Sequence, residues 1–173
     1  MNTVLSKTVI MTAIISLVST QATTAVAADN RIFVTSTEFN ANFGGLEGGD
    51  DICQAAADSA TLGGIWKAWL SGSSTSVGVR MVHSTNRYVL VDGLTVLANN
   101  WDDLVDGGLQ NAINIDENGD SVTGYAWTNS RSDGTLYTSS YSCSDWISSD
   151  YSMAIVGSTA DTGGTWTVSK TLY

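Results

Sequence analysis

Apolar and polar residues alternate along several short stretches of the chain, and this period of two predicts β-strands. In the stretch 65–70, Trp66, Ala68 and Leu70 would lie on one face of such a strand. Other stretches rich in β-formers are 31–35, 87–91, 94–97, 124–128, 153–157, 165–168 and 171–173. The pattern predicts a small, mainly antiparallel sheet. Asp92 and Gly93 separate two of these runs, and this pair predicts a hairpin with a two-residue turn.

A helical period appears in two places. Small or apolar residues recur at helical spacing from Ile52 to Ala60, with Asp50 or Asp51 as the expected N-cap and Gly63-Gly64 as the expected end. The glycines that precede this stretch, at 44, 45, 48 and 49, predict a loop of tight turns and close packing.

A second short helix is expected at 100–105, where Trp101, Leu104 and Val105 would face inward and Gly107-Gly108 would end it. The long segments between Trp127 and Trp166 are rich in Ser, Thr, Asp and Gly, and predict polar loops. Together these patterns predict an α+β domain with two short helices, a small sheet and long polar loops.

The N-terminal segment has the features of a signal peptide. Lys7 precedes an apolar run at 9–18, and Ala25-Val26-Ala27 has the small-x-small form of a cleavage site. The run is roughly half as long as a membrane span requires, so no membrane anchor is expected. Residues 1–27 are therefore predicted to be removed, and 28–173 to form a single secreted domain.

The chain has 17 acidic and 7 basic residues, a formal net charge of −10. This balance argues against nucleic acid and anionic lipid as partners, because both require basic surfaces. By count alone, Cys53 and Cys143 could form one disulfide, worth ~4 kcal/mol by loop-closure entropy. These two cysteines and the single His83 are too few for a zinc site of the Cys/His type.

Asp116, Asn118 and Asp120 alternate as the ligands do in the first half of a calcium loop. An EF-hand would need glycine at Ser121 and glutamate at Trp127, so this is not one. The three residues could belong to another calcium site, completed by the nearby aspartates Asp102, Asp103 or Asp106. The alternative is a polar turn in which Asn-Gly supplies the positive φ.

Four segments resemble an uncharacterised family of exported bacterial domains: R-I-F-V-T-S-T from Arg31, G-G-L-x-G-x-D from Gly44, C-Q-A-A-A from Cys53 and L-G-G-x-W-K-A-W-L-S from Leu62. That family is grouped with C-type-lectin-like and endostatin-like folds. The resemblance implies a C-type-lectin-like domain whose termini pair in one sheet. It does not imply sugar binding, because the fold serves many functions.

The chain departs from that pattern in two ways. It has no proline, and Asp145-Trp146-Ile147 lacks the Asn-Asp pair of calcium-dependent sugar sites. Related chains also continue past Leu172-Tyr173 to further cysteines, which implies separate partners for Cys53 and Cys143. The resemblance thus argues against a disulfide between Cys53 and Cys143. It implies either that the chain is truncated at Tyr173 or that both disulfides of the family have been lost.

The sequence therefore predicts a secreted or cell-surface recognition or adhesion module without enzymatic activity, whose partner is an extracellular protein or a glycan. The candidate ligand-binding residues are the aromatic residues of the late loops, Tyr137, Tyr141, Trp146 and Tyr151. One alternative is a calcium-stabilised structural surface domain.

The other alternative is a hydrolase that uses paired carboxylates such as Asp102 and Asp106, or Glu117 and Asp120. No nucleophile motif supports it, and His83 is interpreted as a surface or hydrogen-bonded histidine.

Overall fold

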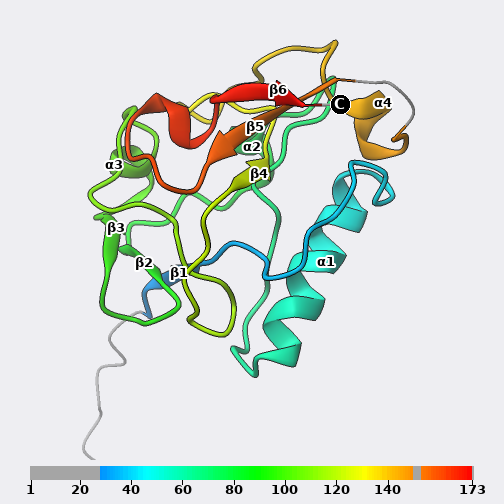
Figure 1. The fold of residues 1–173 in the computed structure, drawn as a ribbon. Helices are drawn as coiled ribbons and strands as arrows, with labels where there is room; N and C mark the ends of the chain where they lie inside the picture. Colours follow the sequence, from blue (N-terminus) through cyan, green and yellow to red (C-terminus); the bar gives the residue numbers. More distant parts are fainter. Residues whose placement is uncertain (1–27, 150–152, 173) are drawn as a thin grey trace, which may run out of the picture.

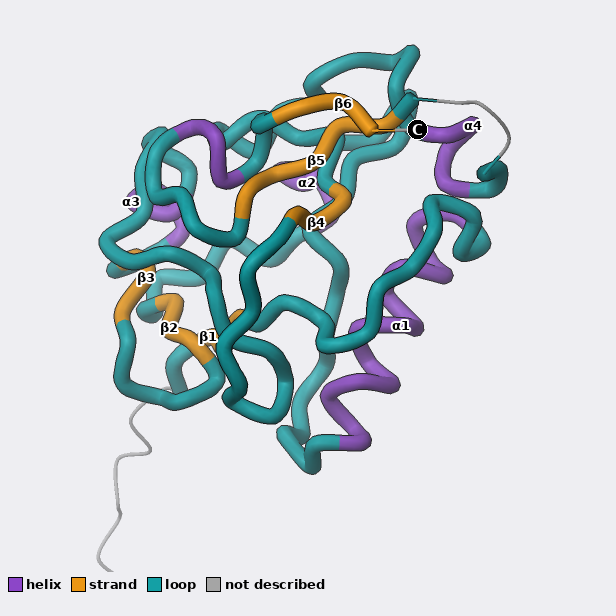
Figure 2. The backbone as a smooth tube through the Cα atoms, viewed as in Figure 1, coloured by secondary structure: helices purple, strands orange, loops and turns teal. Residues whose placement is uncertain are grey.

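The computed structural model describes residues 28–149 and 153–172, so the predicted signal peptide lies outside these ranges. The described chain is an α+β fold with one 15-residue helix and two three-stranded sheets (Figure 1). The long helix, α1 (Gly45–Ser59), runs along one side of the molecule. Much of the chain between the short elements is loop (Figure 2). The further helical turns are α2 (Val77–Arg80), α3 (Trp101–Leu104), α4 (Cys143–Trp146) and the 3₁₀ turn η1 (Gly164–Trp166).

The first sheet consists of β1 (Asn30–Ile32), β2 (Tyr88–Leu90) and β3 (Val96–Ala98), in that order. β1 pairs with β2 in parallel, and β2 pairs with β3 as the predicted antiparallel hairpin. The connection is longer than the predicted two-residue turn. Asp92 Oδ1 accepts hydrogen bonds from the backbone of Leu94 and Thr95, which closes a loop over 91–95.

The second sheet is antiparallel and consists of β4 (Tyr125–Trp127), β5 (Ala154–Ser158) and β6 (Lys170–Leu172). β4, β5 and β6 confirm three predicted strands. The predicted strand at 165–168 is wrong, because Trp166 closes a 3₁₀ turn with Gly163. Since β1 and β6 belong to different sheets, the expectation that the termini pair in one sheet is also wrong.

Helix α1 begins at Gly45, earlier than the predicted caps at Asp50 and Asp51. Three of the glycines expected in a loop, Gly45, Gly48 and Gly49, lie in its first turns, and neighbours come very close to the last two. A Cβ on Gly49 would stand 2.6 Å from Leu70 Cδ1. The helix also ends before Gly63-Gly64: Thr61 has φ 58°, and Leu62 N donates to Ala57 O as in a Schellman motif.

The stretch 65–70 keeps its alternating burial but is not a strand. Its backbone groups bond to side chains instead of to a neighbouring strand. Ala68 N donates to Asp50 Oδ1, and Arg80 donates to the carbonyl oxygens of Ala68 and Leu70. The alternation therefore reported burial correctly, while the strand prediction was wrong.

Two hydrophobic clusters form the core. The larger one lies under the first sheet and confirms Trp101 and Leu104 as the buried positions of α3. Trp69 packs against it, with its ring centroid 5.0 Å from that of Trp166. The smaller cluster joins α1, α4 and β5 and includes Cys143, with Cys53 packed against it. No disulfide joins these two cysteines in the described structure.

Candidate functional site

A hollow of about 310 Å³ opens where the start of α1 meets the loop 72–75 and α4. Its lining contains three glycines, three hydroxyl side chains and two carboxylates beside the apolar Leu46. The lining residues are Gly44, Gly45, Leu46, Glu47, Gly72, Ser73, Ser74, Thr75 and Asp145. Because glycines form two of its walls, backbone groups are accessible there as well as side chains.

Asp145 joins two walls of this hollow. Its carboxylate accepts hydrogen bonds from the backbone N–H of Ser73 and, at 2.6 Å, from the Ser73 hydroxyl. The backbone N–H of Asp145 donates in turn to Ser142 Oγ. The space beside Asp145 is tight, since a Cβ on Gly72 would lie 3.0 Å from Asp145 Oδ1. These contacts hold loop 72–75 against α4.

Helix α4 is a left-handed turn. Its four residues have φ values of 47°, 56°, 60° and 67°, and none of them is glycine. Such a conformation costs ~1–2 kcal/mol per residue. The turn is held from both sides, because Trp146 O accepts hydrogen bonds from Phe43 N and Gly44 N just before α1. The strain therefore lies directly beside the hollow.

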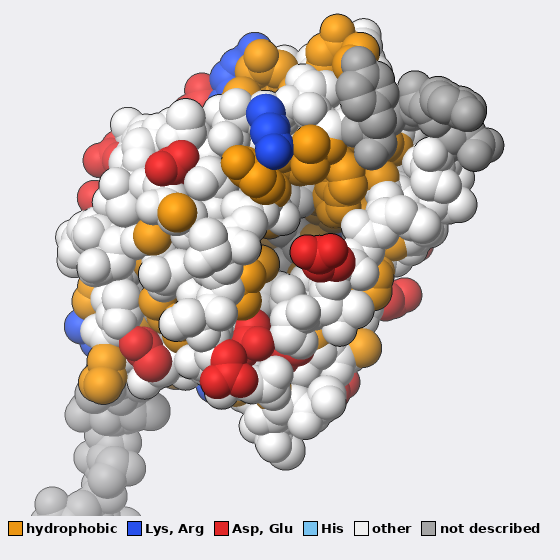
Figure 3. Space-filling model, viewed as in Figure 1, with side chains coloured by type: hydrophobic (Ala, Val, Ile, Leu, Met, Phe, Trp, Pro, Cys, Tyr) orange, Lys and Arg blue, Asp and Glu red, His pale blue; other side chains and the backbone are white. Residues whose placement is uncertain are grey.

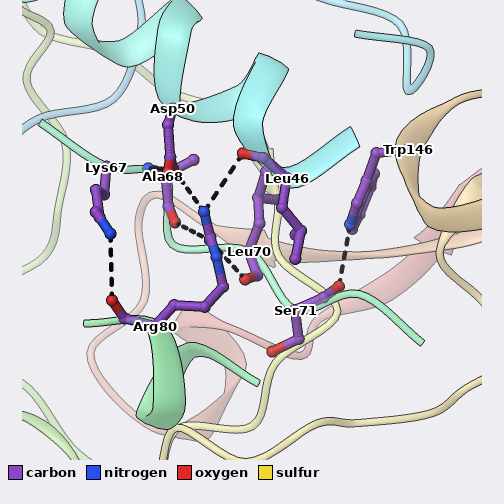
Figure 4. Close-up of polar contacts among 8 residues, drawn as sticks. All are labelled: Leu46, Asp50, Lys67, Ala68, Leu70, Ser71, Arg80 and Trp146. Atoms are coloured by element: carbon purple, nitrogen blue, oxygen red, sulfur yellow. Dashed lines mark hydrogen bonds and ion pairs between the residues drawn. The ribbon is translucent and has the colours of Figure 1, made fainter. Parts of the chain in front are cut away.

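The Trp146 ring anchors this turn to the core. The ring is fully buried, stacks on Phe43 with centroids 5.4 Å apart, and donates from Nε1 to Ser71 O over 3.0 Å (Figure 4). A ligand has no access to this ring in the structure, so Trp146 is not carried into the proposed ligand-binding surface. Its role in the described fold is to fix the position of Ser71, which precedes the loop 72–75.

Arg80 fixes the opposite wall. Its Nη2 lies 2.7 Å from Asp50 Oδ1 and 3.3 Å from Leu46 O, and its Nη1 donates to the carbonyl oxygens of Ala68 and Leu70 (Figure 4). One guanidinium thus ties α2 to α1 and to the stretch 65–70. Sequence reasoning missed Arg80. The available signal was a rare basic residue within the apolar run V-G-V-R-M-V of an acidic chain.

Residues 36–164 match the family described as "Protein of unknown function (DUF1554)". The chain belongs to the DUF1554 family. The matched range contains every residue that lines the hollow, together with Asp50 and Arg80, whereas β1 and β6 lie outside it. No curated protein matches this chain. Within the described part of this DUF1554 domain, no helix is long and apolar enough to cross a membrane.

Two other predicted ligand-binding residues of the DUF1554 domain, Tyr137 and Tyr141, do not line the hollow. Tyr137 is exposed, and the Arg131 guanidinium lies 5.3 Å from its ring centroid. Tyr141 is half-buried. Tyr151 lies outside the described residues. The described lining of the hollow includes neither Tyr137 nor Tyr141, so their binding role stays a prediction for a separate surface.

The predicted calcium residues form a compact turn. The Asp116 carboxylate is buried, and its Oδ1 accepts hydrogen bonds from the backbone of Asn118 and Asp120. Gly119 has φ 87°, which fits the alternative of a polar turn. Asn118 and Asp120 are exposed. No group of three His, Cys, Asp or Glu residues suited to a metal ion occurs in the ranges that the structure describes, and calcium binding stays a prediction.

The carboxylates and the histidine considered for catalysis have structural contacts. Glu117 accepts a hydrogen bond from Ser36 N at 2.8 Å. Asp106 Oδ1 accepts one from Gly108 N at 3.1 Å. The His83 ring stacks on Trp101 with centroids 4.1 Å apart, and its Nε2 contacts Gly78 O. These contacts explain the three residues as parts of the fold.

Proposed function

We propose that this DUF1554 domain is a non-catalytic recognition module that is secreted or displayed at the cell surface. The hollow is the observation that supports the proposal best. Its walls come from three distant parts of the chain and are held by Arg80, Trp146 and Asp145 through contacts within the protein. A site that is already in shape loses less entropy on binding, which favours recognition.

The lining indicates the class of group that would bind. Glu47 and Asp145 contribute carboxylates, and Ser73, Ser74 and Thr75 contribute hydroxyls. The chain carries a formal net charge of −10, so an anionic group would be repelled. The hollow is therefore proposed to take a neutral polar or cationic group of an extracellular protein or a glycan.

The same proposal includes secretion through the signal peptide at 1–27, a role in adhesion, and a relationship to C-type-lectin-like folds. These parts rest on the sequence motifs. The absence of catalysis is proposed from the hollow itself. A hydrolytic triad needs a nucleophile, a histidine base and a carboxylate that orients the histidine. Ser73 Oγ lies 2.6 Å from an Asp145 oxygen, but no histidine is among the described residues that line the hollow.

Filling the hollow tests the proposal. The chain 28–173 and its Ser74→Trp variant would be compared on glycan and extracellular-protein arrays, with Thr85→Trp, at an exposed position elsewhere, as the matched control. We expect a binding signal that Ser74→Trp abolishes and Thr85→Trp retains, with equal unfolding midpoints for both variants.

If Ser74→Trp left every specific signal intact, the hollow would be removed from the proposal. The absence of any specific signal with the folded wild-type chain would overturn the recognition function. Turnover of an arrayed substrate would overturn the non-catalytic assignment.

A further inference from the structure

Aromatic side chains and a lysine gather on one face of the second sheet, where the half-buried Trp127 ring also packs against Trp146 with centroids 6.2 Å apart. We define this aromatic face as Phe39, Tyr125, Trp127 and Lys170. Tyr125 and Trp127 are two residues apart in β4 and so lie on the same side of the sheet. Tyr125 is 50% exposed and Phe39 is 39% exposed. Figure 3 shows apolar side chains gathered around a single basic side chain in this region.

Hydrogen bonding and strand register make these residues one continuous surface. Trp127 Nε1 donates to Phe39 O at 2.8 Å, which places the loop containing Phe39 beside β4. Val156 pairs with Trp127 on one side and with Lys170 on the other, so Lys170 stands on the same face of the sheet. The Lys170 ammonium lies 3.6 Å from the Tyr125 ring centroid, a cation–π contact.

Lys170 differs from the other basic residues that the structure describes. Arg31, Lys67, Arg80, Arg87 and Arg131 all donate to protein oxygen atoms. Within 28–149 and 153–172, Lys170 has the Tyr125 ring as its contact and no oxygen acceptor. Its side chain is exposed, so the N–H groups that do not face the Tyr125 ring are available to a ligand.

We propose that the aromatic face binds a glycan whose sugar rings pack on the exposed Tyr125 and Phe39 rings, beside the half-buried Trp127, and whose carboxylate pairs with Lys170. Sugar rings present C–H groups that pack on aromatic faces, while their hydroxyls stay in water. The chain is acidic overall, so a densely charged polyanion is repelled, whereas an isolated carboxylate can pair with Lys170 at this face. A protein partner of standard size would cover ~800 Å² on each side, more than these four residues offer.

The probe is a hyaluronan oligosaccharide, in which carboxylated and uncharged sugars alternate, titrated into the chain 28–173 by calorimetry. We expect saturable binding that Lys170→Gln weakens about tenfold, the loss of one charge-assisted hydrogen bond. Tyr125→Thr should weaken binding by a similar factor, because it removes the exposed ring while keeping a strand-forming residue.

Lys67→Gln and Ile65→Thr are the matched controls, because they remove an exposed cation and an exposed apolar side chain elsewhere. Both are expected to bind like the wild type. Ser74→Trp in the hollow should also bind normally, so this proposal and the proposed function can fail separately.

Three results would overturn the inference: no binding of the oligosaccharide, wild-type affinity in the Lys170→Gln or the Tyr125→Thr variant, or equally tight binding of an uncharged glucose oligosaccharide. If a poly-glutamate peptide bound more tightly than the oligosaccharide, and if Lys170→Gln and Tyr125→Thr weakened that binding, the aromatic face would be assigned to an acidic protein segment instead. Tighter binding of heparin would contradict the charge argument.

Discussion

Arg80 Nη2 lies 2.7 Å from Asp50 Oδ1, and the Arg80 side chain is only 9% exposed. The same guanidinium serves the carbonyl oxygens of Ala68 and Leu70, so Arg80→Met leaves several buried acceptors without a donor. We expect a loss of about 3–5 kcal/mol in the free energy of unfolding, measured by urea denaturation. Arg87→Met breaks an ion pair whose arginine side chain is 52% exposed, and should leave the urea midpoint nearly unchanged. Equal losses would contradict this role of Arg80.

The left-handed turn α4 predicts a stabilising substitution. Ser144 is exposed and has φ 56°, where glycine is not strained. Ser144→Gly should raise the free energy of unfolding by about 1 kcal/mol, visible as a higher urea midpoint. Ser139→Gly is the control, because Ser139 is exposed and is not among the residues with positive φ, so that change should be neutral or slightly destabilising. A lower midpoint for Ser144→Gly would show that α4 does not have this conformation in solution.

The calcium prediction is tested by thermal unfolding of 28–173 in calcium and in EDTA. A site filled at ~100 times its Kd stabilises by about 2.7 kcal/mol, a rise of several degrees in Tm for a domain of this size. Asp120→Asn should remove the rise, since Asp120 is exposed and its carboxylate would be a ligand. An unchanged midpoint in the wild-type chain would end the calcium hypothesis for Asp116, Asn118 and Asp120.

The Cys53 thiol is expected to be slow to react. Burial raises its pKa to about 11, and the Asp50 carboxylate adds to the shift. Because the thiolate is the nucleophile, iodoacetamide at about pH 8 should label Cys53 much more slowly in the folded chain than in urea, as followed by peptide mass spectrometry. Equal rates in the two states would mean that Cys53 is accessible in the folded chain.

The same raised pKa gives a pH dependence with a definite sign. The Cys53 thiol has its ordinary pKa of 9.0 in the unfolded chain and a pKa of about 11 in the folded chain, so folding favours the protonated form. This contribution to the free energy of unfolding is complete below pH 9.0 and is lost as the pH rises through about 11. Urea midpoints should therefore fall over that interval, and they should fall less in Cys53→Ala. An identical decline in both chains would assign the effect to other groups.

Sequence patterns predicted those elements whose partners are local. The β2–β3 hairpin follows from Asp92-Gly93 between two β-rich runs, and α3 follows from the spacing of Trp101 and Leu104. β5 follows from a continuous apolar run. Each of these depends on side chains within a few residues of one another, which a pattern can report.

The errors occurred where a distant group decides the local structure. The stretch 65–70 has the alternation of a strand, but the Arg80 and Asp50 side chains occupy the backbone groups that a neighbouring strand would need. The first turns of α1 contain glycines that usually indicate a loop, and Gly49 is explained in a helix by the packing of Leu70, which is distant in the sequence. For the same reason the hollow was not predicted, because its walls are adjacent only in space.

The parallel pairing of β1 with β2 determines the order in which the first sheet can assemble. Asn30 pairs with Tyr88, whereas β2 and β3 are joined by a short loop. During synthesis Asn30 leaves the ribosome well before Tyr88, so β1 stays without its partner until the intervening chain, including α1, has been made. The hairpin can form rapidly by itself, and closing the long loop back to β1 follows as the slower event. The first sheet is thus complete only when β1, the first of its strands to be synthesised, pairs with β2.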